Sequence, residues 1–132
     1  MEAKGVLIDS SIIIDFFRKQ NKSRTHLYTL FNTCNHLFIS ILTHYELLCG
    51  ATSPELAKDV KQLLDLFLIL EFGIRESECA AEIYRELRRQ NKLINVLDIL
   101  IAATSIELDL PLASLNVQHF SRIQGLKMFP LT

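Results

Sequence analysis

The stretch that decides the fold is Gly5-Val6-Leu7-Ile8-Asp9-Ser10-Ser11-Ile12-Ile13-Ile14, because its apolar pattern changes at Asp9. The residues before Asp9 form a continuous apolar run of strand length, which is typical of a strand buried on both faces. After Asp9 the apolar residues recur at helical spacing, from Ile12 to Phe17. Asp9 therefore ends a predicted strand, and a helix is expected to follow it.

Further apolar runs of strand length alternate along the chain with longer stretches of helical periodicity. Together with the first run, the expected strands cover residues 5–8, 37–41, 68–70, 112–115 and 126–129. Helices are expected at roughly 22–32, 55–66, 77–90 and 97–108, and Ser53-Pro54 is a good helix start. Because crossover helices separate continuously apolar strands, we expect a mostly parallel sheet covered on both faces. The predicted fold class is an α/β protein, a three-layer α/β/α sandwich with a five-stranded sheet, and no repeat or linker divides the single domain expected over residues 1–132.

Composition and charge exclude several classes of protein. The chain is 49% hydrophobic, which is enough for a packed core and excludes an intrinsically disordered or fibrous protein. Its 14 basic and 15 acidic side chains give a formal net charge of −1, so bulk charge does not attract nucleic acid or an anionic membrane. The most apolar windows are far shorter than the ~18 residues that cross a bilayer. The three cysteines lie far apart, which predicts buried thiols in a reducing compartment and a cytoplasmic location.

Four oxygen-bearing side chains stand where predicted strands end or the next helices begin. Asp9 ends the first strand, Glu46 follows the second strand by about one helical turn, Asp98 opens a very apolar helix, and Asn116 follows the fourth strand. Sites in open α/β sheets form beyond the carboxyl ends of the strands. We therefore predict that these four residues gather in one site.

Each acid also has a purely structural interpretation. Asp9 or Asp98 can cap a helix N-terminus, and Thr43-x-x-Glu46 fits a capping box. Their joint placement favours a metal site, because two like charges ~4 Å apart repel by about 4 kcal/mol at an effective dielectric constant of roughly 20. A cation offsets that repulsion, and oxygen ligands without histidine or cysteine select Mg²⁺ or Mn²⁺. Such ions work with phosphate groups, which predicts phosphodiester hydrolysis.

The same residues lie in short motifs whose order and spacing resemble a known family. The motifs are Leu7-Ile8-Asp9-Ser10-Ser11, Ser40-Ile41-Leu42-Thr43-His44-Tyr45-Glu46-Leu47, Asp98-Ile99-Leu100-Ile101-Ala102-Ala103, and Leu112-Ala113-Ser114-Leu115-Asn116 followed by His119-Phe120. In this combination, over nearly the whole chain, the sequence resembles the PIN-domain ribonucleases, and in particular the VapC-type toxins of bacterial toxin–antitoxin pairs.

This resemblance implies a function and a role for each site residue. The protein is expected to be a Mg²⁺-dependent endoribonuclease toxin that cleaves RNA, forms a homodimer and is held inactive by a cognate antitoxin protein. Asp9, Glu46 and Asp98 match the acidic metal-site positions of the family. Asp9 and Asp98 would bind Mg²⁺, or Mn²⁺, directly or through water, and Glu46 would complete the site or accept a proton from the attacking water. Asn116 falls where many members carry a fourth acid, and it is expected to position water or substrate.

Alternatives to this interpretation stay open on the sequence. A nucleotide-binding flavodoxin-like or Rossmann module would share the fold class, but the four glycines form no phosphate-binding loop. A catalytically degenerate PIN domain would act as an RNA- or protein-binding partner, and Asn116 favours it.

The four histidines lack metal-ligand spacing and are expected in surface or structural roles. Asp15 is expected to pair with Arg18, and the basic residues around Arg18 to contact phosphates or solvent.

Overall fold

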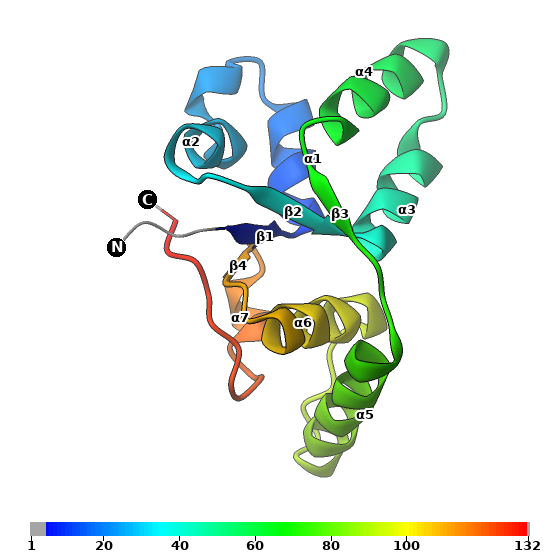
Figure 1. The fold of residues 1–132 in the computed structure, drawn as a ribbon, viewed down its shortest axis with the longest axis vertical. Helices are drawn as coiled ribbons and strands as arrows, with labels where there is room; N and C mark the ends of the chain where they lie inside the picture. Colours follow the sequence, from blue (N-terminus) through cyan, green and yellow to red (C-terminus); the bar gives the residue numbers. More distant parts are fainter. Residues whose placement is uncertain (1–4, 132) are drawn as a thin grey trace.

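The computed structural model describes residues 5–131, and a parallel sheet of four strands forms its centre (Figure 1). The strands are β1 (Val6–Ile8), β2 (Leu37–Ser40), β3 (Leu68–Leu70) and β4 (Leu112–Ala113). They lie in the order β3-β2-β1-β4, so every connection within the sheet is a crossover. Leu7 of β1 pairs with Phe38 on one side and with Leu112 on the other. The mostly parallel sheet predicted from the sequence is confirmed.

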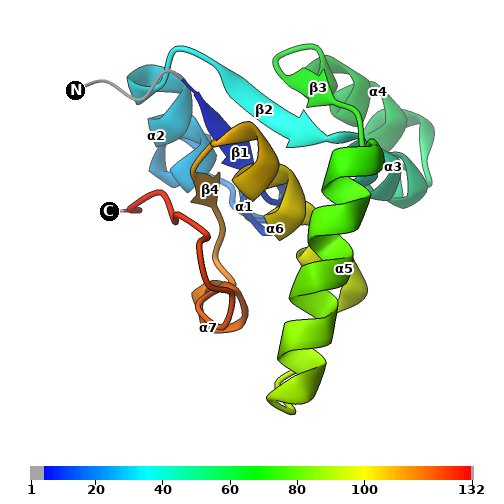
Figure 2. The same cartoon turned by 60° about the horizontal axis from the view of Figure 1, so that its bottom comes forward.

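Helices cover both faces of the sheet. They are α1 (Ser10–Arg18), the 3₁₀ turn η1 (Lys22–Arg24), α2 (His26–Thr33), α3 (Ile41–Gly50), α4 (Pro54–Leu64), α5 (Ile74–Arg89), α6 (Val96–Leu108) and α7 (Val117–Phe120). Helices α1 to α4 lie on one side of the sheet and α5 to α7 on the other, as Figures 1 and 2 show from two directions. The predicted three-layer α/β/α arrangement is therefore confirmed.

Strand β1 explains why its sequence is a continuous apolar run. Val6 and Ile8 pack into the core between the sheet and the α1–α4 layer, while Leu7 packs into the core under α5 and α6. All three side chains are completely buried. Successive side chains of a strand point to opposite faces, so a central strand between two helical layers needs an apolar residue at every position.

The prediction of a fifth strand is wrong. Residues 126–129 make one isolated parallel bridge, between Leu112 and Met128, and do not form a strand. The neighbouring strand β4 has only two residues, because its partner β1 ends at Ile8, which pairs with Ala113. Because β4 is so short, only one residue of the C-terminal segment, Met128, pairs with it.

The helix predictions also need correction. The helix expected at 22–32 is divided, because Thr25 has an extended backbone and its hydroxyl accepts a hydrogen bond from the amide of Tyr28, which begins α2 at His26. Helix α5 begins three residues earlier than expected, at Ile74, because the Glu76 carboxylate accepts from the Gly73 amide. The predicted start of α4 at Ser53-Pro54 is confirmed.

Two side-chain expectations are also corrected. Asp15 pairs with Lys19, at 3.0 Å, instead of with Arg18, which lies beside Glu46 and Leu56. The cysteines are not fully buried: Cys34 and Cys79 are half-buried, and Cys49 is exposed on α3. Cys34 and Cys79 pack against the cores on the two faces of the sheet, whereas Cys49 lies at the surface.

Candidate metal centre

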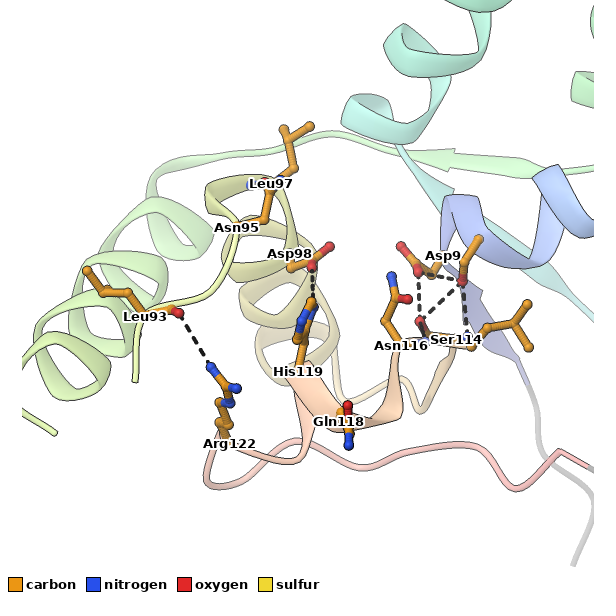
Figure 3. Close-up of polar contacts among 12 residues, drawn as sticks. Asp9, Leu93, Asn95, Leu97, Asp98, Ser114, Asn116, Gln118, His119 and Arg122 are labelled. Carbon is orange, nitrogen blue, oxygen red and sulfur yellow. Dashed lines mark hydrogen bonds and ion pairs between the residues drawn. The ribbon is translucent and has the colours of Figure 1, made fainter. Parts of the chain in front are cut away.

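Asp9 lies at the carboxyl end of β1, where the strand turns into α1, and it is almost completely buried. Its side chain does not cap α1. The carboxylate oxygen Oδ2 instead accepts hydrogen bonds from the hydroxyls of Ser11, at 2.8 Å, and Ser114, at 2.7 Å. Figure 3 shows this network at the edge of the sheet. The hydroxyl bonds occupy one carboxylate oxygen and leave Oδ1 available to a cation.

Glu46 is held in the second turn of α3, the helix that follows β2 directly. Ser40 caps this helix, because its hydroxyl accepts from the Leu42 amide. The capping box of Thr43 and Glu46 is therefore absent, and the Thr43 hydroxyl is buried without a hydrogen-bond partner. Burial raises the pKa of the Glu46 carboxyl, and the charges of Asp9 and Asp98 raise it further.

Asp98 lies in the first turn of α6, which Asn95 caps by accepting from the Leu97 amide. The alternative in which Asp98 caps this helix is thus wrong. Burial raises the pKa of the Asp98 carboxyl most strongly, and the negative charge of Asp9 adds to the effect. His119 acts in the opposite direction on this pKa, with its Nδ1 atom 3.7 Å from Asp98 Oδ2 (Figure 3).

Asp9, Glu46 and Asp98 are distant in the sequence, but the fold brings their carboxylates close enough for their charges to interact. Asp9 raises the pKa of both Glu46 and Asp98, and Asp98 raises that of Glu46. Effects of this kind require charges close enough to repel each other. The arrangement costs free energy in the absence of a cation, because burial and repulsion both oppose ionisation.

The donor set fits a hydrated divalent cation. Among the described residues, no three His, Cys, Asp or Glu side chains are already spaced as direct ligands of one ion. Mg²⁺ usually keeps several waters and takes one or two carboxylates from the protein. Asp9 through Oδ1 and Asp98 would hold such an ion, with Glu46 on its water shell. These ligand roles stay predictions.

The segment after β4 supplies the remaining polar groups. Asn116 directly precedes α7, and its backbone amide donates to the Ser114 hydroxyl at 2.9 Å. In Figure 3 its exposed side-chain amide is drawn between the carboxylates of Asp9 and Asp98. His119, one helical turn later, is half exposed beside Asp98. Sequence reasoning gave His119 no part in the site, although its i+3 spacing from Asn116 was the available signal.

An apolar groove of about 320 Å³ adjoins this site between α1, α3 and α4. Ile14, Phe17, Leu56 and Val60 line it, and Glu46 stands at its wall. Arg18 also lines this groove, so a basic side chain lies at its border. The site therefore continues into an apolar surface on the α1–α4 side.

Glu46 allows a direct test of the cost of the acid cluster. Its pKa in the folded state is raised above the value of an unfolded chain, so its ionisation destabilises the folded protein as the pH rises through that interval. At pH 7.5 in EDTA, Glu46→Gln is expected to raise the melting temperature by a few degrees, and the gain is expected to vanish at about pH 3, where the carboxyl is protonated in both states.

Differential scanning fluorimetry at the two pH values measures this effect. Glu78→Gln, an exposed glutamate on α5, is the matched control and is expected to change the melting temperature little. A Glu46→Gln protein that melts below the wild type at pH 7.5 would contradict the inference that the ionised Glu46 carboxylate destabilises the folded protein.

Fold and site together define a class: a parallel α/β protein with a carboxylate cluster at the carboxyl edge of its sheet, suited to a divalent cation. A model of the PIN domain matches residues 6–126. This chain therefore belongs to the PIN domain family. The predicted relationship is confirmed.

Its curated relatives are named ribonucleases. Ribonuclease VapC1 of Rickettsia felis is 34% identical, and the match covers 97% of each chain. Ribonuclease VapC19 of Mycobacterium tuberculosis is 32% identical, with 92% of this chain and 96% of that protein covered. Ribonuclease VapC1 of Methanocaldococcus jannaschii is 28% identical over 97% of this chain and 89% of its own length.

Solved structures share the fold. VapBC-1 from nontypeable Haemophilus influenzae matches with a TM-score of 0.82 and 22% identity, covering 95% of this chain and 96% of that chain. A toxin–antitoxin complex from Klebsiella pneumoniae matches with a TM-score of 0.68 and 26% identity, covering 92% and 94%. Within residues 5–131 of the present protein, no helix is both long and apolar enough to cross a membrane.

Proposed function

We propose that this protein is the ribonuclease toxin of a toxin–antitoxin pair and that it hydrolyses RNA phosphodiester bonds with Mg²⁺ as cofactor. The observation that carries the proposal is the convergence of Asp9, Glu46 and Asp98 at the carboxyl edge of the sheet, where the charge of Asp9 raises the pKa of both other carboxyls. The ribonuclease names of relatives that match almost the full length of this chain support it.

Each residue has a distinct part in the proposed reaction. Asp9 Oδ1 and Asp98 would hold the cation, which when bound would make a nearby water more acidic and offset charge on the phosphate. Glu46 is suited to accept a proton from the attacking water, because its raised pKa lies closer to neutral pH than that of an ordinary glutamate. His119 orients the Asp98 carboxylate, and the Asn116 amide positions water or an RNA oxygen.

Cleavage of RNA by the purified protein tests this function. We expect cleavage with Mg²⁺ or Mn²⁺, none after addition of EDTA, and recovery when the ion is restored in excess. Asp9→Asn is expected to abolish cleavage while the far-UV circular dichroism spectrum stays that of the wild type. RNA binding without cleavage under every metal condition would instead support the degenerate PIN domain as a binding partner.

The groove beside Glu46 suits an antitoxin partner. Its lining by Ile14, Phe17, Leu56 and Val60 would accept apolar side chains, and the adjoining carboxylates would attract a basic residue. An antitoxin segment of this chemistry would cover the metal site and hold the enzyme inactive. The toxin–antitoxin complexes among structures of the same fold support this assignment.

A second copy of the chain is the proposed partner of the outer face of α3. Ile41, Tyr45 and Leu48 are 38%, 65% and 51% exposed and recur at helical spacing. The edge strand β3 contacts α3 and also exposes Leu68 and Ile69. A helix face and an unpaired strand edge of this apolar character need a cover, and a homodimer would supply it.

A further inference from the structure

The hydrogen bonds around Asp9 form a directed network. The Leu115 amide donates to the Ser11 hydroxyl at 3.0 Å, and the Asn116 amide donates to the Ser114 hydroxyl at 2.9 Å. Each hydroxyl has one proton to donate. Since a backbone amide already points at each hydroxyl oxygen, both protons are directed to the same acceptor, Asp9 Oδ2.

We propose that Ser11 and Ser114 are positioning residues that fix the Asp9 carboxylate so that only Oδ1 faces the metal. This inference rests on the proposed function, and it assigns to the serines a role that the acid motif by itself does not contain. Two short hydroxyl bonds to one oxygen prevent rotation of the carboxylate, which would otherwise exchange its oxygens or bind the ion with both.

The same network ties the site together across the sheet. Ser11 belongs to α1 and Ser114 follows β4, and their hydroxyl oxygens converge to 3.3 Å. Ser114 is 1% exposed and Asp9 is 3% exposed, so the hydrogen bond between them is shielded from water. Because the Asn116 amide is bound to Ser114, the turn that presents the Asn116 side chain is fixed by the same contacts.

Measuring the metal affinity distinguishes serines that position the Asp9 carboxylate from serines that only stabilise the fold. Manganese binding to the full-length protein, measured by isothermal titration calorimetry without RNA, is expected to weaken about tenfold in Ser11→Ala and in Ser114→Ala. Ser11→Thr keeps the hydroxyl and is expected to retain wild-type affinity. In RNA cleavage, kcat is expected to fall with little change of KM in the alanine variants.

Ser10→Ala is the matched control, because Ser10 neighbours Ser11 on α1 and takes no part in the network. If Ser114→Ala does not fold, Ser11→Ala carries the test, since Ser11 is only half-buried. Alanine variants that melt lower but bind Mn²⁺ as tightly as the wild type would overturn the inference and leave the proposed function intact. A wild-type protein that neither binds Mn²⁺ nor cleaves RNA would overturn both.

Discussion

Asp98→Asn is expected to slow RNA cleavage by on the order of 10³-fold while the protein stays folded. Asparagine has nearly the same shape as aspartate but lacks the charge that would hold a divalent cation. Burial and the charge of Asp9 raise the pKa of Asp98, so ionisation of this carboxyl is costly unless a cation is present. Removal of the charge therefore costs no stability in the metal-free protein and eliminates the interaction on which the proposed reaction depends.

Cleavage of RNA under single-turnover conditions measures this loss, and growth of cells that express the protein without its partner gives a second measurement. We expect wild-type expression to stop growth and Asp98→Asn to relieve the arrest at an unchanged protein level. The matched control is Asp109→Asn, because Asp109 pairs with Lys127 at an exposed position after α6. An Asp98→Asn protein as toxic and as active as the control would refute the assignment of the site.

Leu7→Ala is expected to lower the free energy of unfolding by about 3 kcal/mol. Leu7 is completely buried in the central strand, where it packs in the core under α5 and α6. Loss of its side chain removes buried apolar surface and leaves a cavity between two strand neighbours, Phe38 and Leu112, which hold the backbone in place. Because β1 carries Asp9, we also expect weaker Mn²⁺ binding.

Urea unfolding followed by circular dichroism measures this change. Leu108→Ala makes the same substitution at a position that is 43% exposed, near the end of α6, and it is expected to cost less than about 1 kcal/mol. Equal destabilisation by the two variants would show that the central strand does not carry the core as described.

The acid cluster links stability to function. The charges of Asp9, Glu46 and Asp98 oppose one another, so the metal-free protein stores unfavourable electrostatic energy at the edge of its sheet. A bound divalent cation would convert that repulsion into attraction and stabilise the fold by mass action. In the absence of metal, the same charges would attract a basic side chain of the antitoxin. By occupying the metal site, that side chain would inhibit the enzyme.

Much of this arrangement could be predicted from local patterns. The run Val6-Leu7-Ile8 could be predicted to be a buried strand. It lies between two apolar cores, so each of its three residues has to be apolar. Asp9, Glu46 and Asp98 could be selected because a parallel sheet brings the carboxyl ends of its strands to one edge. The fifth strand could not be excluded, because the two-residue length of β4 depends on its pairing with β1, which ends at Ile8.

The sequence by itself determined the alternation of strand and helix and the positions at which charged residues interrupt it, since both follow from periodicity over a few neighbouring residues. Only the tertiary structure decided which side chains meet at those positions. Ser114 and Asp9 are 105 residues apart, and His119 reaches Asp98 from another element. Contacts of this kind arise from the packing of whole helices on the sheet, and short-range periodicity does not encode them.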